Sequence, residues 1–359
     1  MKKKLLIFCI LSAFFCTGCS TVKEVFVSEE EMISSVAELH ETVENALKKG
    51  QTEIHFVTET LGQADLVNLN EEHDGFYGSV RQYEMKTVQW LDRSYITLQC
   101  EISDNYYVEN AILYGGEIPT ERVQAQELKK SCEKILKKID AEASDYKKEK
   151  KIHDYLVRNV AYGYPEGREQ KDSTGYLAYG ALVEGKAVCN GYAQAMKLLC
   201  DLTGVECQMI AGQADGENHA WNLVRLGEKW YHADVTWDDP EPDEKDRMLY
   251  SYFNLHDEEM ALTHQWNAAE YVAAEGRKYQ YYRKNDLYCK NMEEFRETCE
   301  EIFAKENPES VQVLVEDYDE NRYNEENLQF IFRYSGAESI HLQTIGKASY
   351  TVLYFTLRY

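Results

Sequence analysis

Residues 185–193 have the sequence GKAVCNGYA and place Cys189 directly before a helical pattern. Apolar residues then recur at helical spacing until the pattern stops at Gly204. We therefore expect Cys189 at a helix N-terminus, where unpaired backbone N–H groups and the helix dipole favour an anion. Thiolate is the nucleophilic form of cysteine, so this position suits a reactive cysteine. Gly191 is expected to leave room for a substrate backbone.

A hairpin is predicted over residues 218–237, with two strands joined at Gly227. A Gly-X pair between strands is typical of a two-residue type II′ turn, which fixes the register of the pairs that follow. Continued along both strands, this register places His219 opposite Thr236 and makes Asp234 a diagonal neighbour of His219 on the same face. An imidazole and a carboxylate can meet across that distance.

A cysteine, a histidine and an aspartate brought together in this way form a nucleophilic triad. Cys189 would attack a carbonyl, and His219 would take the thiol proton and later protonate the leaving amine. Asp234 would fix the imidazole tautomer and stabilise the imidazolium. His232 lies on the same predicted face and is a rival base.

The oxyanion of such a reaction needs hydrogen-bond donors. The backbone N–H of Cys189 is one candidate donor, and Tyr179 and Gln194 are candidates for the second. No metal or cofactor site is evident. The acidic run at residues 238–244 is more typical of a solvated loop than of a cation site.

The motifs around these residues resemble those of the transglutaminase-like superfamily, bacterial branch. The resemblance extends over residues 145–256, about a third of the chain, and Asn190 stands where many relatives have an acidic residue. It implies a papain-like α+β core and action on amide bonds by transamidation, deamidation or peptide hydrolysis. The segments that carry it are GKAVCNGYA (185–193), NHAWN (218–222), WYHADVTWD (230–238), IHDYL (152–156) and YFN (252–254).

The N-terminus has a basic start at residues 2–4 and an apolar run at residues 5–15, followed by Thr-Gly-Cys ending at Cys19. This pattern resembles a bacterial lipoprotein signal, although Cys16 stands where the lipobox usually has Leu. It implies a lipid anchor on Cys19 and a location at the extracytoplasmic face of the cell membrane. A plain secretory signal cleaved nearby is the alternative.

Composition narrows the choice of partners. The net charge is −24, which repels nucleic-acid phosphates, so nucleic-acid binding is excluded. Apart from the cysteines of the signal and Cys189, six remain for disulfides or for buried free thiols.

The chain is long enough for more than one domain. Both flanks of the core follow the order helix, strand, connecting segment, strand, strand, so residues 30–103 and 292–359 are predicted to be a structural repeat. Residues 104–118 are expected to be irregular. The predicted division is a signal peptide (1–19), an N-terminal α/β module (20–118), the catalytic core (119–290) and a C-terminal α/β module (291–359).

Two functions fit these features. The first is a surface-anchored thiol enzyme that acts on protein or peptide amides through a thioester of Cys189. The second is a non-catalytic envelope lipoprotein that uses the same fold for binding or scaffolding, because a fold does not guarantee an activity.

Overall fold

The computed structural model describes residues 31–48, 51–61, 80–170, 172–239, 247–316, 318–347 and 350–359. Two compact units make up the chain, residues 1–129 and 130–359, and each is described by itself. This division falls inside helix α6, whereas the sequence places a boundary at residue 118. The predicted signal peptide and Cys19 lie outside the described residues. Within the described ranges, no helix is both long enough and apolar enough to cross a bilayer.

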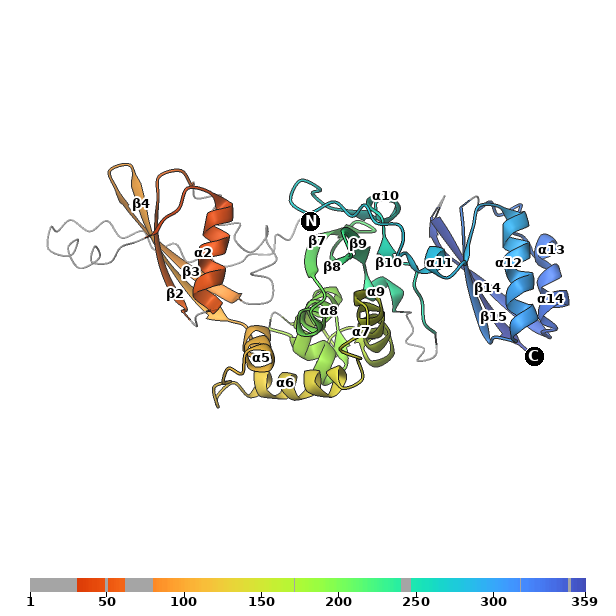
Figure 1. Ribbon diagram of the computed structural model, residues 1–359, viewed down its shortest axis with the longest axis horizontal. Helices are drawn as coiled ribbons and strands as arrows, with labels where there is room; N and C mark the ends of the chain where they lie inside the picture. The colour runs from red at the N-terminus through yellow and green to blue at the C-terminus, as the bar shows by residue number, and fades with distance from the viewer. Residues whose placement is uncertain are drawn as a thin grey trace. The chain divides into compact units, whose positions relative to one another are not determined.

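The N-terminal module is a four-stranded sheet with one helix against it (Figure 1). Its strand order is β1-β2-β4-β3; β1 is parallel to β2, and the other neighbours are antiparallel. Leu39, Val43 and Phe56 are fully buried in the core between helix and sheet. The elements are β1 (Glu31–Met32), α2 (Val36–Lys48), β2 (Glu53–Thr58), β3 (Val80–Trp90) and β4 (Arg93–Ile102).

The prediction of an irregular segment at 104–118 is wrong for most of its length. Helix α5 (Asp104–Leu113) begins there, and the Ser103 hydroxyl caps it by accepting from the backbone N–H of Tyr106. Its apolar residues follow no clear helical stripe, so sequence periodicity did not reveal it.

The core, which the sequence predicts to be catalytic, places helices beside a five-stranded antiparallel sheet of order β10-β9-β8-β7-β11 (Figure 1). Its helices and turns are α6 (Val123–Leu136), α7 (Asp145–Asn159), η2 (Thr174–Tyr176), η3 (Gly180–Glu184), α8 (Cys189–Thr203), α9 (Val235–Asp238), α10 (Asp257–Met260) and α11 (Tyr281–Lys284). Its strands are β5 (Ala161–Tyr162), β6 (Lys186–Ala187), β7 (Cys207–Ala214), β8 (Glu217–Leu226), β9 (Lys229–Ala233), β10 (Phe253–Leu255) and β11 (His264–Gln265).

Helix α8 packs against β8, and side-chain polar contacts join the two elements. Met196 and Leu199 on α8 are buried. The Asn222 amide on β8 donates to the carbonyl of Ala193 on α8, with a distance of 3.1 Å between nitrogen and oxygen. The mixed helices and sheets agree with the predicted α+β class.

The C-terminal module has the same topology as the N-terminal one. Its strand order is β12-β13-β15-β14, and only the pair β12–β13 is parallel. Helix α12 follows the first strand, as α2 does in the other module, so the order of elements and strands agrees with the predicted repeat. The elements are β12 (Tyr288–Cys289), α12 (Met292–Lys305), β13 (Ser310–Val315), α13 (Glu325–Leu328), α14 (Phe330–Ser335), β14 (Ser339–Lys347) and β15 (Tyr350–Arg358).

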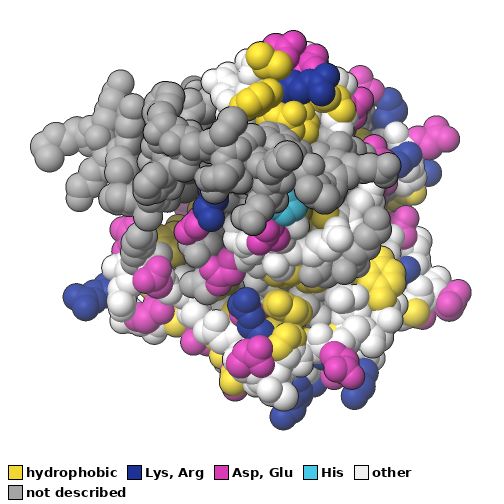
Figure 2. Space-filling view, turned by 90° about the vertical axis from the view of Figure 1, so that its left-hand side faces the viewer, with side chains coloured by type: hydrophobic (Ala, Val, Ile, Leu, Met, Phe, Trp, Pro, Cys, Tyr) yellow, Lys and Arg dark blue, Asp and Glu magenta, His cyan; other side chains and the backbone are white. Residues whose placement is uncertain are grey.

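The surface and the cysteines match the composition. Figure 2 shows Asp and Glu side chains spread over the described part of one face, with Lys and Arg interspersed rather than gathered in one patch.

Every described cysteine is a free thiol, and all of them except Cys189 are buried. Burial raises the pKa of several of these thiols, among them Cys289 to about 11.

Candidate active site

Cys189 is the first residue of α8 and is partly exposed, as the sequence predicts. The helix ends at Gly204, which takes the left-handed conformation with φ of +77°. Gly191 has a different purpose from the predicted one. A Cβ atom there would lie 2.4 Å from the carbonyl oxygen of Gly175, so glycine allows η2, not a substrate, to approach the helix.

The hairpin has the predicted register over its first half. The pairs run from Leu226 opposite Lys229 to Asn222 opposite Ala233, and Gly227 has φ of +66°, as a type II′ turn requires.

Beyond Ala233 the predicted ladder is wrong. Strand β9 ends, and Asp234 becomes the N-cap of α9 because its Oδ1 accepts from the backbone N–H of Trp237 at 3.2 Å. Thr236 therefore lies in a helical turn and not opposite His219.

The three predicted triad residues nevertheless come together. His219 Nε2 lies 2.6 Å from Asp234 Oδ2, and the imidazole also forms a hydrogen bond with the side chain of Cys189. Cys189 comes from α8, His219 from β8 and Asp234 from the start of α9. This arrangement is the one that the nucleophile, base and orienting carboxylate have in a thiol triad.

Electrostatics favour a charged His219–Asp234 pair. Burial opposes the charge on His219, but the carboxylate of Asp234 and the contact with Cys189 outweigh it and raise the pKa of His219 to about 10. Burial also opposes the charge on Asp234, yet His219 and His264 hold the pKa of its carboxyl well below the usual range.

His264 is a member of the site that the sequence did not reveal. Its Nε2 lies 3.0 Å from Asp234 Oδ2, the same oxygen that His219 contacts, and its Nδ1 lies 2.8 Å from the Thr263 hydroxyl. It stands on the short edge strand β11, thirty positions beyond Asp234 and outside every recognisable motif. Only the pairing of β11 with β7 brings it to the site.

The same three side chains are the types that bind transition metals. Around a tetrahedral zinc, ligand atoms about 2.0–2.1 Å from the metal are separated by roughly 3.3 Å. The 2.6 Å between His219 Nε2 and Asp234 Oδ2 is shorter than that and is a charge-assisted hydrogen-bond distance. The geometry therefore fits a hydrogen-bonded chain better than a metal centre.

His232, the rival base, has both ring nitrogens bonded to residues outside the triad. Its Nδ1 accepts from the indole N–H of Trp221 at 2.9 Å, and its Nε2 contacts Asp257 Oδ1 at 2.8 Å. Burial lowers the pKa of His232 despite Asp257, so the ring is fixed as a neutral bridge.

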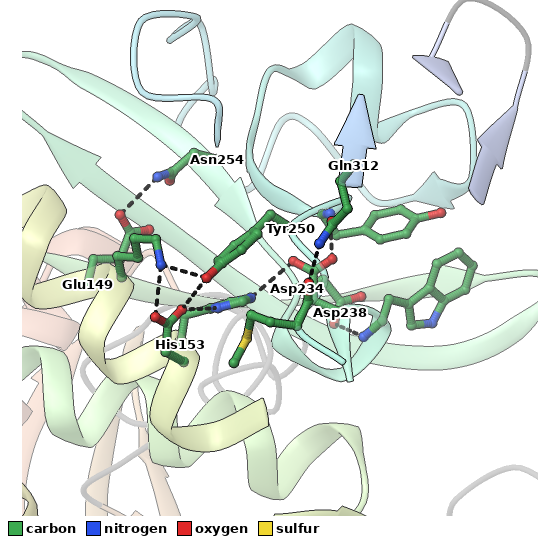
Figure 3. Close-up of polar contacts among 12 residues, drawn as sticks. Glu149, His153, Asp234, Asp238, Tyr250, Asn254 and Gln312 are labelled. Carbon is green, nitrogen blue, oxygen red and sulfur yellow. Dashed lines mark hydrogen bonds and ion pairs between the residues drawn. The ribbon is translucent and has the colours of Figure 1, made fainter. Parts of the chain in front are cut away.

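A second buried network supports the turn that carries Asp234 (Figure 3). His153 on α7 lies between two carboxylates, with its Nε2 3.1 Å from Asp238 and its Nδ1 3.3 Å from Asp154. Asp238 ends α9 and also accepts from the backbone N–H of Tyr252. Burial opposes the charge on His153, but the two aspartates raise its pKa to about 9.

One candidate for the oxyanion hole, Gln194, lies on α8, and the other, Tyr179, precedes η3. The Gln194 side-chain oxygen, on α8, accepts from the backbone N–H of Ala178 at 3.3 Å. Tyr179 follows Ala178 in the chain and directly precedes η3. A role of Tyr179 or Gln194 in binding the oxyanion stays a prediction.

Comparison with known proteins places this region in a family. Residues 133–235 match the family model of the transglutaminase-like superfamily. The kyphoscoliosis peptidases of Mus musculus and Homo sapiens are 27% identical over 106 residues, which make up 26% of this chain and 16% of theirs. The chain therefore spans only a small part of the length of these curated relatives.

Solved structures show weaker similarity. A crystal structure of a TGase shares 17% identity with a TM-score of 0.29, over 51% of both chains. A candidate cysteine protease from Cytophaga hutchinsonii shares 16% identity with a TM-score of 0.26, over 54% of this chain and 70% of the other. The segment that matches the family model, residues 133–235, includes Cys189, His219 and Asp234.

Proposed function

We propose that this chain is a thiol enzyme that acts on protein or peptide amide bonds through a thioester of Cys189. The observation that carries the proposal is the continuous contact from Cys189 to His219 and from His219 to Asp234. A structural cysteine has no need of a histidine held by a buried carboxylate.

The chemistry follows from this contact. Cys189 loses its proton to His219, and Sγ attacks the amide carbonyl carbon to give a tetrahedral oxyanion. Collapse breaks the C–N bond, and the His219 imidazolium gives its proton to the departing amine or ammonia. The thioester is then cleaved by water, which gives hydrolysis or deamidation, or by a second amine, which gives transamidation.

We further propose that the enzyme works at the extracytoplasmic face of the cell membrane, held by lipid on Cys19. Support comes from the basic start, the apolar run and the Thr-Gly-Cys sequence. Mass spectrometry of the mature N-terminus should find a diacylglyceryl-cysteine. An unmodified N-terminus at another position would refute the anchor and leave the catalytic proposal intact.

The catalytic proposal is tested by incubating the protein with an envelope protein mixture and a fluorescent amine, with ammonia and new N-termini measured in parallel. Wild type should show amine incorporation, ammonia release or cleavage, and Cys189→Ala should show none. Cys100→Ala is the matched control, because Cys100 lies in the N-terminal sheet. Undiminished turnover by Cys189→Ala would overturn the proposal, and no turnover by any variant would favour the binding-module function.

A further inference from the structure

We propose that His264 is a positioning residue that holds the Asp234 carboxylate ionised and aimed at His219, so that the triad is extended to a chain of four residues. This inference rests on the proposed function, because it gives Asp234 the orienting role. It adds a histidine that neither the sequence motifs nor the matched family segment, residues 133–235, includes.

The hydrogen bonds at Asp234 are the first support. Oδ2 lies 2.6 Å from His219 Nε2 and 3.0 Å from His264 Nε2, while Oδ1 accepts from the backbone N–H of Trp237. Asp234 and His264 are each only 1% exposed. A buried carboxylate without such donors would bind a proton, so each donor helps to keep Asp234 charged.

The proton on His264 is placed by its two partners. An ionised carboxylate only accepts hydrogen bonds, so His264 Nε2 must carry the proton that faces Asp234. The Thr263 hydroxyl, 2.8 Å from Nδ1, completes the ring's hydrogen bonding. The ring is therefore held with a donor directed at the carboxylate.

The fold is shaped to bring β11 this close. His264 pairs with Ala214 on β7, and Gly212 on the same strand has no side chain to obstruct the approach. A Cβ atom at Gly212 would lie 2.2 Å from the carbonyl oxygen of Gln265 and 2.8 Å from the Trp221 ring. The centroid of the Trp237 ring lies 4.5 Å from that of the His264 ring, so this ring also packs against His264.

Other titratable groups also face this pair. Asp234 is approached by His219 from β8, by Tyr252 from the segment before β10 and by Asp238 from the end of α9. His264 is further approached by His232 from β9. Neither Tyr252 nor Asp238 donates to Oδ2 in the hydrogen bonds described, so the two histidines supply its donors.

The chain provides a matched control in His232. It is as buried as His264, lies in the same sheet and also contacts an aspartate, Asp257. It has no hydrogen bond to Asp234 among those described. Loss of either histidine should weaken the fold, but only loss of His264 should change the ionisation of Asp234.

The test is the rate of Cys189 alkylation by iodoacetamide against pH, in the full chain, for wild type, His264→Ala, His264→Gln and His232→Gln. His264→Ala removes one donor from a buried charge, so the acid limb of the profile should move up by about one pH unit, a roughly tenfold slower reaction on that limb. His264→Gln places an amide donor near the position of Nε2 and should restore most of the rate. His232→Gln should lower the melting temperature and leave the profile unchanged.

An unshifted profile in His264→Ala, or an equal shift in His232→Gln, would overturn the inference. If His264→Ala does not fold, the inference is tested by comparing His264→Gln with His264→Asn, because only the longer amide side chain reaches Asp234. Equal alkylation profiles for these two variants would also overturn the inference. Alkylation needs no amide substrate. A shifted profile in a protein that turns over no amide would therefore refute the proposed function alone, and turnover with an unshifted profile would refute this inference alone.

Discussion

Asp234 serves the active site and the backbone at once. Its Oδ2 contacts His219 and His264, while its Oδ1 caps helix α9 through Trp237. The capping role ends strand β9 at the residue whose carboxylate contacts His219. A substitution at Asp234 therefore separates the two roles only if it preserves the cap.

Asn is such a substitution, since Asn is also a good N-cap. We expect Asp234→Asn to keep the cap of α9, to lose the stability that the charged pair with His219 contributes, and to lose turnover, because an amide favours the wrong tautomer and cannot stabilise the imidazolium. His219→Ala should cost more, about 10²–10⁴-fold, because it removes the base itself. Steady-state kinetics of the two single variants and the double variant will check this, with losses that do not multiply. A greater loss in Asp234→Asn than in His219→Ala would contradict the assigned roles.

The charged His219–Asp234 pair also predicts how stability depends on pH. The raised pKa of His219 gives stability that is complete below about 6.5, the value for an unperturbed histidine, and is lost as pH rises through about 10. The lowered pKa of Asp234 gives stability that is present above about 4 and is lost as pH falls through the lowered value. The difference in unfolding free energy between wild type and His219→Gln should thus be largest between about pH 4 and 6.5. Urea titrations across this range measure it, and a difference that grows toward pH 10 would contradict the pairing.

At the scale of elements, helix α8 must hold its position against β8 for Cys189 to meet His219. Asn222 contributes to this by donating to the carbonyls of Ala193 on α8 and Gln208 on β7. Asn222→Ala should lower the unfolding free energy by about 1–3 kcal/mol, because buried carbonyls lose their partner, and should slow Cys189 alkylation. Asn159→Ala is the control: that exposed amide donates to the carbonyl of Tyr155 on α7, and its loss should change stability by less than about 0.5 kcal/mol.

Helix α7 carries a buried acid with a single described partner. Glu149 accepts from the Asn254 amide at 2.9 Å, and its second oxygen and the Asn254 oxygen have no partner among the described residues (Figure 3). Burial, only partly offset by Asn254 and His153, raises the pKa of Glu149 to about 8. Folding therefore becomes less favourable as pH rises from the unfolded value near 4.5 to about 8, at roughly 1.4 kcal/mol per unit of pKa difference.

Glu149→Gln removes this titration and keeps an acceptor for the Asn254 amide. The variant should gain stability over wild type as pH rises from 5 to 8, and thermal melts at these two values will show it. Glu297→Gln, at an exposed position on α12, is the control and should show no such trend. An equal difference at both pH values would mean that Glu149 is ionised in the fold.

For the whole molecule, the two flanking modules share a strand order although they share few residues. The C-terminal module belongs to the same compact unit as the core and is tied to it by side chains: Gln312 on β13 accepts from the Tyr282 hydroxyl, and Gln280 donates to that of Tyr350. The first module belongs to the other unit.

This division predicts how fragments behave. A fragment of residues 119–359, which retains all of α6, should fold and keep the alkylation profile of Cys189. A fragment of residues 119–287 should melt at lower temperature, because buried Gln280 and Tyr282 lose partners. Circular dichroism melts and alkylation of both fragments test this; equal melting temperatures would show that the C-terminal module does not support the core.

Local patterns along the chain were sufficient to predict several of the helices and strands and the residues of the candidate site. The apolar stripe after Cys189 and the Gly turn at Gly227 are short-range features, and they predict the helix start and the first half of the hairpin. The predicted strand pairing at Asp234 was wrong, because this residue caps α9 instead. Helix periodicity and strand alternation depend only on neighbours in the sequence, so they can be recognised without a fold. The same holds for the order of elements in both flanks.

Contacts between distant segments were decided by the tertiary structure alone. His264 reaches Asp234 because β11 pairs at the sheet edge and Gly212 allows its approach, and no local pattern encodes such a pairing. His232 is excluded as the base because Trp221 and Asp257 hold both of its nitrogens. The sequence by itself determined which residues could carry the chemistry; the packing of the sheet determined which histidines share the carboxylate, because burial and hydrogen-bond distance are properties of the folded chain and not of residue spacing.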